Sequence, residues 1–279
     1  MTRISVVSAR GRLTALTLLA VIGSSLVAPV LASAADVSVA PATITAQEAR
    51  LVGLLNADRA AVGLVPVQVD SRLMTIARAR SADMVAKHYF SHTQPDGKNV
   101  FSILTTARVI SFGAGEIIAW NNYPIDVSAS TANRQWMNSP GHKAIVVSTN
   151  LNYVGVGLAV DPATGKKVWT AVYIKGPDRT GARVSFAAPT VSSGSTATTR
   201  RINLAWSGAD VRLQVLTAGL RSYQIERKVD AGAWTKVTGT TGRSLAVSAA
   251  KGHVYQFRIV AYDRAGNHGA WSTTTVNLR

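Results

Sequence analysis

Apolar positions early in the chain recur with the spacing of amphipathic helices. Leu51, Leu54 and Leu55 fall on one face of a helix that we expect to begin at Thr45-Ala46-Gln47-Glu48, a segment with capping-box spacing. Gly63 suits the left-handed residue that stops such a helix. The pattern therefore predicts a first helix that packs on its leucine face.

A second helix is predicted from Asp70 or Ser71, fading near Lys87, so that Tyr89–Asp96 forms a loop. Its inner face carries Leu73, Ile76, Ala77, Met84 and the stem of Arg80. Shorter helical segments are indicated over Asn99–Ala107, Asp126–Met137 and Gly141–Val147.

Two strands follow these helices. Tyr153–Val160 alternates large and small residues, and Lys167–Lys175 is rich in β-branched and aromatic side chains. Asp161-Pro162-Ala163-Thr164-Gly165 joins them as a hairpin turn. Helices followed by an antiparallel hairpin favour an α+β arrangement in layers.

The C-terminal third changes character. Ser, Thr, Ala and Pro dominate around Ala187–Thr199, and we interpret residues 181–199 as a linker. Short strand candidates then recur at regular spacing, which predicts an all-β sandwich over residues 200–279. These candidates are Ile202–Trp206, Val211–Val215, Ser222–Lys228, Ala233–Val237, Ser244–Val247, Val254–Tyr262 and Ser272–Leu278.

The N-terminus predicts export. Three arginines precede an apolar run over Leu13–Leu31, and Ala32-Ser33-Ala34 is a small-residue cleavage site, as in a secretory signal peptide over residues 1–34. An uncleaved anchor is the alternative. After cleavage no transmembrane segment is expected, and residues 35–44 are interpreted as a short linker. We therefore expect a secreted protein that folds without disulfides, because the chain has no cysteine.

The formal net charge of +16 falls to +13 without the three signal-segment arginines. Residues 36–185 hold 15 basic and 10 acidic side chains, whereas residues 186–279 hold 12 and 4. The C-terminal module should therefore be attracted to anionic surfaces such as wall polymers or lipid headgroups, unless its charge serves solubility alone. Nucleic acid is not expected as a partner, because no reading motif is present.

Three separated segments carry the candidate chemistry: Ser91-His92-Thr93, Gly115–Ala119 and Trp136–His142. Two imidazoles and the Glu116 carboxylate offer three protein ligands and an open fourth position, as expected of an accessible site for a divalent metal such as zinc. The alternative is a buried hydrogen-bonded cluster that fixes loops to the core, because an unpaired buried carboxylate is costly.

The order of these segments resembles the bacterial branch of the CAP superfamily (cysteine-rich secretory, antigen 5, pathogenesis-related 1) between about Thr45 and Tyr173. The resemblance implies an α–β–α sandwich over residues 45–180 and assigns His92, Glu116 and His142 to its cleft. The chain departs from the family pattern at Ile117, where Asn is usual, and at Ala171, where Gln is usual. Residues 200–279 resemble a fibronectin type III module, with Trp206 and Tyr255 as core residues.

Other residues of the region admit two interpretations each. Ser139 is either a nucleophile near His142 or, as we prefer, the cap of the next helical turn. Trp120, Tyr123 and Trp136 suit a groove for sugar rings or lipid tails, but Trp136 is expected in the core. We interpret His88 as a surface histidine, and Asn56 and Arg59 as residues that fasten the first helix by hydrogen bonds.

The sequence thus favours a secreted, non-enzymatic CAP-domain protein that binds a ligand in the cleft and attaches through its basic β-sandwich. The rival enzyme would be a metal-assisted hydrolase of peptide or peptidoglycan with Glu116 as general base. A second rival is an extracellular lipid- or sterol-binding protein, and a third is a purely structural adhesion protein. The ligand, the metal and the oligomeric state are left open.

Overall fold

The computed structural model describes residues 46–279, so the predicted signal segment, the linker over 35–44 and Thr45 lie outside the described residues. The first part of the described chain, from α1 to β4, forms a three-layer domain. Its middle layer is a four-stranded sheet of order β1-β3-β4-β2. β1 runs parallel to β3, and the other neighbours are antiparallel. The strands are β1 (Gln68–Val69), β2 (Ala114–Asn121), β3 (Tyr153–Val160) and β4 (Lys167–Ile174).

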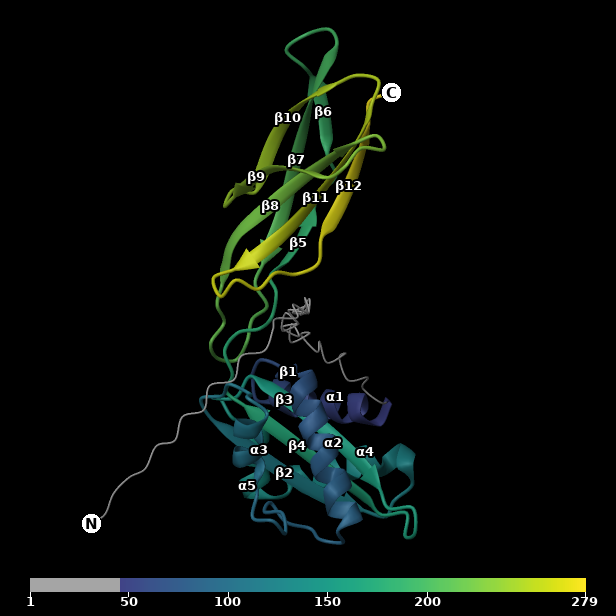
Figure 1. Ribbon diagram of the computed structural model, residues 1–279, viewed down its shortest axis with the longest axis vertical. Helices are drawn as coiled ribbons and strands as arrows, with labels where there is room; N and C mark the ends of the chain where they lie inside the picture. The colour runs from purple at the N-terminus through teal and green to yellow at the C-terminus, as the bar shows by residue number, and fades with distance from the viewer. Residues whose placement is uncertain (1–45) are drawn as a thin grey trace, which may run out of the picture. The chain divides into compact units, whose positions relative to one another are not determined.

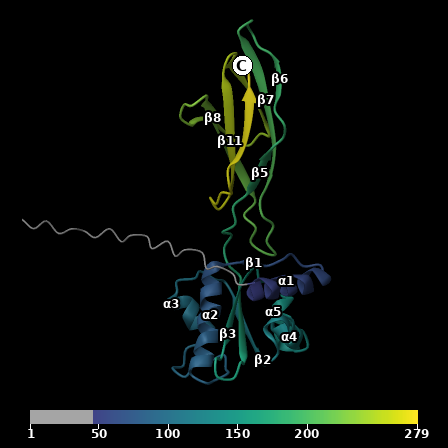
Figure 2. The same cartoon turned by 90° about the vertical axis from the view of Figure 1, so that its right-hand side faces the viewer.

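Helices cover both faces of this sheet (Figures 1 and 2). One outer layer holds α2 (Ser71–Ala86) and α3 (Val100–Thr106); the other holds α1 (Ala46–Ala61), α4 (Ile125–Met137) and α5 (Pro140–Val146). The α–β–α sandwich expected from the sequence is therefore confirmed. In the part of the chain described here, no helix is long and apolar enough to span a bilayer.

The helix predictions for α2 and α3 are confirmed at both ends. Asp70 is the N-cap of α2, where its carboxylate accepts a hydrogen bond from the Arg72 backbone, and Lys87 ends the helix. Asn99 caps α3 in a capping box. The Glu48 carboxylate of α1 accepts hydrogen bonds from Arg78 Nε at 2.9 Å and Leu158 N at 3.3 Å, which joins α1 to α2 and β3.

Burial on both faces explains why β2 was not predicted. In β4, Trp169, Ala171 and Tyr173 pack with α1 and α4, whereas Val172 and Ile174 pack with α2 and α3. β2 lies beside β4 and is likewise covered on both sides, with six of its eight residues buried. Such strands lack the alternation that identifies half-buried strands in a sequence.

The remaining strands form two antiparallel sheets that enclose a second core, which confirms the predicted β-sandwich. Trp206 and Tyr255 lie in that core, as expected. One sheet has the order β10-β7-β5 with β6 also on β7, and the other has the order β12-β11-β8-β9. Their bounds are β5 (Arg183–Phe186), β6 (Thr190–Ser193), β7 (Thr199–Ala209), β8 (Leu220–Val229), β9 (Thr235–Thr240), β10 (Ser244–Ala250), β11 (Val254–Asp263) and β12 (Ser272–Asn277).

Two predictions about this region are wrong. The predicted linker over residues 181–199 contains β5 and β6, both of which pair with β7. These strands were interpreted as a linker because their polar residues face solvent at a sheet edge. The strand over Val211–Val215 is instead an irregular loop. Its Leu213 is buried with Leu73 and Ile174, and Gln214 Oε1 accepts a hydrogen bond from Val65 N at 2.8 Å.

Helix α2 lies so close to β3 that two glycines are required there. A Cβ at Gly155 would be 2.1 Å from the Leu73 carbonyl carbon, and one at Gly157 would be 2.2 Å from Arg78 N. Both clashes involve helix backbone, which cannot move aside as a side chain can. The alternation of small and large residues in β3 thus reflects helix contact on one face.

We expect Gly157→Ala to lower the free energy of unfolding by more than about 3 kcal/mol or to prevent folding, because α2 must shift to admit the methyl group. Gly53→Ala is the matched control, since nothing lies within 4 Å of its Cβ in α1. That change should stabilise by roughly 0.5–1 kcal/mol through helix propensity. Thermal unfolding of both variants tests the contact; equal melting temperatures would contradict it.

Candidate functional site

A buried ion pair lies at the centre of the predicted site. Glu116 projects from β2 and Arg80 from α2, and Arg80 Nε lies 2.8 Å from Glu116 Oε1. The Arg80 side chain is 1% exposed and that of Glu116 is 2% exposed. Burial alone would lower the pKa of Arg80, but the hydrogen bond and charge of Glu116 raise it. The carboxylate beside it therefore holds the buried guanidinium in its charged form.

The second oxygen of Glu116 orients His92, which lies in the loop after α2. His92 Nδ1 is 2.8 Å from Glu116 Oε2, and the carboxylate can only accept in this contact, so Nδ1 carries the proton. The His92 side chain is 53% exposed. In the neutral ring, Nε2 then has a lone pair for a ligand.

Arg80 also fixes the loop that carries His92. Its two terminal nitrogens donate to the Tyr89 hydroxyl at 2.7 Å and to the Ser91 carbonyl at 2.8 Å. Tyr89 in turn donates to Asp83 Oδ2 at 2.6 Å, and burial together with this bond raises the pKa of Tyr89 to about 12. One guanidinium thus connects helix, loop and edge strand.

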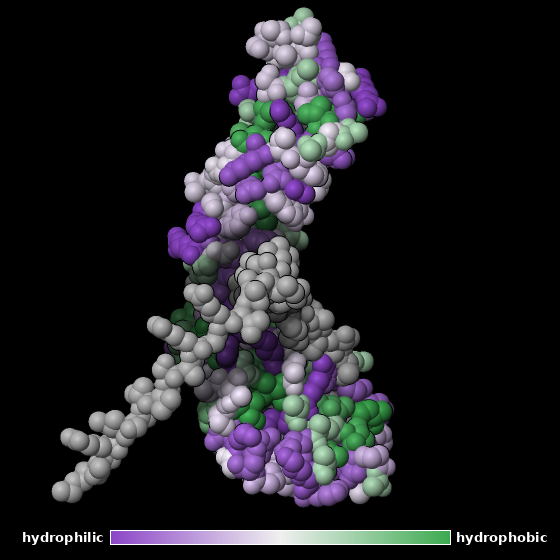
Figure 3. Space-filling view, in the orientation of Figure 1, coloured by the Kyte–Doolittle hydropathy of each residue, from purple (hydrophilic) through white to green (hydrophobic). Residues whose placement is uncertain are grey.

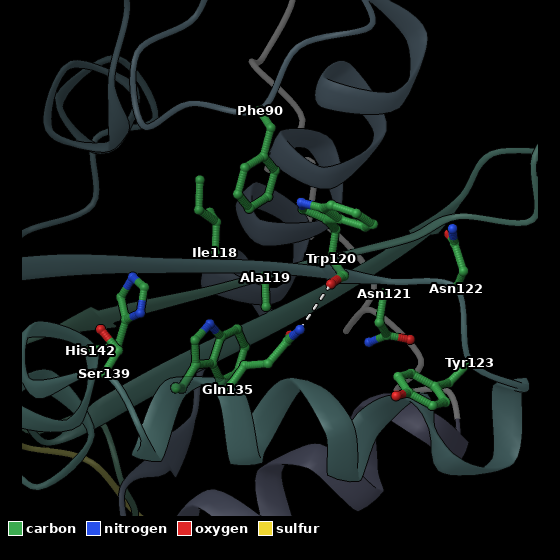
Figure 4. Close-up of a pocket in the computed structure, with 11 residues that line it drawn as sticks. Phe90, Ile118, Ala119, Trp120, Asn121, Asn122, Tyr123, Gln135, Ser139 and His142 are labelled. Carbon is green, nitrogen blue, oxygen red and sulfur yellow. Dashed lines mark hydrogen bonds between the residues drawn. The ribbon is translucent and has the colours of Figure 1, made fainter.

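His142 lies on α5 and lines a groove beside this network, together with Phe90 and Trp120 (Figure 4). Burial lowers the pKa of His142, and the charge of His92 lowers it further, so the two imidazoles are close enough to interact electrostatically. The neutral form, which is the metal-binding form, is favoured at His142. The structure thus brings all three predicted residues into one region, while their role as metal ligands remains a prediction.

The role of Arg80 was not predicted from the sequence. Its stem was expected on the inner face of α2, but the guanidinium was given no partner, although a cation on an inner helix face requires one.

The departure from the family pattern at Ile117 has a structural reason, because this side chain is fully buried in the main core and does not face the site.

Of the other predicted residues, Trp136 and His88 lie as expected and Ser139 does not. Trp136 is fully buried, His88 is exposed at a turn, and Trp120 and Tyr123 line the groove. Ser139 occupies the N-cap position of α5, but its hydroxyl makes no capping hydrogen bond, so that prediction is wrong.

The prediction that Asn56 and Arg59 fasten the first helix is confirmed. The Asn56 side chain makes two hydrogen bonds with the backbone of Val67. Arg59 donates to the carbonyl oxygens of Val65, Val146 and Ser148. Both side chains therefore stabilise the fold and have no part in the cleft.

A second polar cluster, missed from sequence, joins residues far apart in the chain. Carboxylate oxygens of Asp178, Asp210 and Asp263 lie within 4.8 Å of one another. Burial raises the pKa of Asp210, and the two neighbouring carboxylates raise it further. Each carboxylate accepts hydrogen bonds from the chain itself, including those from Ala218 N, Gly219 N and Asn267 N.

The model of the cysteine-rich secretory protein family, or CAP, matches residues 52–173. Residues 52–173 form a CAP domain. A curated relative, the uncharacterized protein YkwD of Bacillus subtilis, is 35% identical over 136 residues, which are 48% of this chain and 49% of the relative. The uncharacterized membrane protein YlbC of the same organism is 29% identical over 131 residues, covering 47% and 35%. The chain thus spans at most about half the length of these relatives.

Among solved structures, an extracellular protein containing an SCP domain from Bacillus anthracis is similar to the CAP domain. It is 26% identical, with 46% of this chain and 40% of that chain covered and a TM-score of 0.41. A cysteine-rich secretory protein from Staphylococcus aureus is 18% identical, covers 46% and 38%, and has a TM-score of 0.38. The match of the family model and of the curated relative YkwD confirms the expected likeness to bacterial CAP proteins.

Removing the Arg80 guanidinium leaves a buried carboxylate without its partner. We expect Arg80→Met to lower the free energy of unfolding by about 3–5 kcal/mol, and Arg80→Met with Glu116→Gln to recover much of the loss. Urea denaturation followed by circular dichroism measures both.

Lys98→Met is the matched control, because Lys98 pairs with Asp96 at an exposed position. Its effect should stay within about 1 kcal/mol. A small effect of Arg80→Met, or a double variant less stable than the single one, would contradict the central role of the ion pair.

Proposed function

We propose that the protein is a secreted, non-enzymatic binding protein whose CAP-domain cleft takes a ligand beside His92 and His142, with a divalent cation such as zinc on the two imidazoles. The observation that supports it is the contact of His92 Nδ1 with a carboxylate that Arg80 already neutralises. Metal-ligating histidines typically donate their second ring N–H to a carboxylate in this way, which fixes the ring and the tautomer.

In this proposal Glu116 has a different part from the one expected of a direct ligand. One of its oxygens faces Arg80 Nε and the other faces His92 Nδ1, with Arg80 Nη2 also at 3.4 Å. A cation bound directly to this carboxylate would compete with the guanidinium for the same lone pairs. The residues therefore fit a metal held by His92 and His142, with Glu116 orienting His92 from behind.

The same contacts disfavour the hydrolase. A general base must be within reach of the proton that it takes, either directly or through one water molecule. The Glu116 side chain is 2% exposed and its oxygens already accept hydrogen bonds from Arg80 and His92. This arrangement suits a positioning carboxylate better than an acceptor of protons from water.

Zinc titration followed by calorimetry tests the cation site. We expect binding by the wild type, a loss of tenfold or more in affinity for His92→Ala and for His142→Ala, and a loss of roughly 10–100-fold for Glu116→Gln. His88→Ala is the matched control, because His88 is exposed at the end of α2 and makes no part of the network.

Circular dichroism must show that each variant is folded, since Glu116→Gln also weakens the ion pair. Absence of zinc binding, or an equal loss in His88→Ala, would contradict the cation site. Turnover of a wall peptide by the zinc-loaded protein, abolished by Glu116→Gln, would instead favour the hydrolase.

We further propose that the β-sandwich attaches the protein to anionic cell-wall polymer. In residues 187–279 every exposed charged side chain is basic, whereas the four acidic ones are at least partly buried. The exposed cations are Arg201, Arg212, Arg221, Lys236, Arg243, Lys251, Arg264 and Arg279. Because the acidic groups are shielded, the module presents a net positive surface to polyanions.

Attachment is tested with the full chain and purified cell walls in a sedimentation assay. We expect Arg201→Glu, Lys236→Glu and Arg243→Glu together to abolish most binding, and binding to weaken as salt rises from 0.01 to about 1 M. Triple replacement of Thr235, Ser244 and Thr275 by Ala, at exposed uncharged positions of the same module, is the control. Salt-independent binding would contradict an electrostatic attachment.

A further inference from the structure

A groove with aromatic walls extends from His142 along the free edge of β2. Its volume is about 470 Å³, within the range of small-molecule sites. Phe90, Trp120 and Tyr123 line it and are 41%, 44% and 54% exposed. Figure 4 shows Ser139 and His142 at one end and Asn122 and Tyr123 at the other. Large aromatic side chains this exposed, gathered around one hollow, indicate a binding surface.

Two buried polar atoms among the lining residues have no hydrogen-bond partner in the described part of the chain. They are Asn121 Oδ1, an acceptor, and Trp136 Nε1, a donor. Asn121 uses only its amide nitrogen, which donates to the Ser128 carbonyl at 3.2 Å. Both atoms are buried and do not meet a ligand directly, but the exposed amides of Asn122 and Gln135 on the same lining offer a donor and an acceptor. An acetamido group has this pair.

The electrostatic character of the groove fits an uncharged polar ligand. The lining residues include amides and a hydroxyl, at Asn122, Gln135 and Ser139, and no carboxylate. A cationic partner would therefore meet no opposite charge here. One cation lies close by, because Lys166 Nζ is 4.6 Å from the Trp120 ring centroid and 5.8 Å from that of Phe90.

The binding surface continues beyond Trp120. A second cavity of about 480 Å³ adjoins the first, and Phe90, Trp120 and Asn122 line both. Lys166 and Asp161 line the second cavity but not the first. Two hollows that share aromatic rings suit a polymer with repeating ring units more than one small molecule.

We propose that this groove binds a glycan strand built of N-acetylated amino sugars. Pyranose rings place flat C–H faces on the exposed aromatic rings, and their acetamido and hydroxyl groups pair with the amides of the groove. The inference deepens the proposed function, because it names the ligand class of the CAP-domain cleft and rests on that cleft being a ligand site.

The alternatives fit the groove less well. An extended peptide would add to the free edge of β2 through backbone hydrogen bonds. The Trp120 carbonyl on that edge is already occupied by Gln135 Nε2 at 3.2 Å, as Figure 4 shows. A lipid tail would offer no hydrogen bond to the exposed amides of Asn122 and Gln135. On the face shown in Figure 3, hydrophobic residues gather over the region of α4, where Ile125 and Val127 are exposed, and are interspersed with polar ones.

The test measures binding of hexa-N-acetylchitohexaose to the full chain by calorimetry, with and without zinc. Cellohexaose, which has similar rings but no acetamido groups, should bind about tenfold more weakly or worse, because the groove amides lose their acetamido partner. We expect Trp120→Ala to lower affinity roughly tenfold or more and Trp120→Phe to retain most of it. Phe112→Ala is the matched control, since Phe112 is 64% exposed on the same domain and lines neither cavity.

Several outcomes would overturn the glycan. These are no binding of the acetylated hexamer, equal affinity for cellohexaose, or an equal loss in Phe112→Ala. Trp120-dependent binding of an extended hexapeptide or of phosphatidylglycerol vesicles in its place would also overturn it. Zinc titration of the same samples separates the two proposals. If zinc binds through His92 and His142 while the glycan does not, the inference fails and the proposed function stands.

Discussion

The contact between the Arg80 guanidinium and the Glu116 carboxylate is the constraint on which the cleft depends. It crosses from α2 to the edge strand β2, and its side chains are almost fully buried. Two charges can be kept there only if each satisfies the other and the remaining hydrogen-bonding positions are filled. Tyr89, Ser91 and His92 fill them, so the geometry of the exposed imidazole follows from an interaction inside the protein.

This arrangement divides the cleft into two chemically different parts. One part is polar, with His92 oriented by Glu116 and with His142 near enough for the charge of His92 to lower its pKa. The other is the aromatic groove along β2, which His142 also lines. His142 therefore belongs to both parts. A ligand in the groove would lie beside the His142 imidazole, so a cation bound there and the ligand would share one residue.

The sequence predicted best those elements whose ends or periodicity are determined locally. The Asp70 and Asn99 caps and the β3–β4 hairpin depend on nearby residues, and each lies where expected. β2 was missed because burial on both faces removes its alternation. Arg80 was only half understood, since its partner lies 36 positions away in the sequence and only folding brings the two together. Ser139 met the pattern of a cap without making the bond.

The loop over residues 210–219 changes how the two halves of the chain should be regarded. Leu213 completes an apolar cluster of the CAP domain, and Asn152 Nδ2 donates to the Val215 carbonyl at 3.1 Å. A protein fragment that stops at residue 180 would therefore lack the buried Leu213 side chain and the hydrogen bonds that this loop makes with the CAP domain. Transfer of the CAP domain at that boundary would therefore require a replacement for the contacts of Leu213 and Val215.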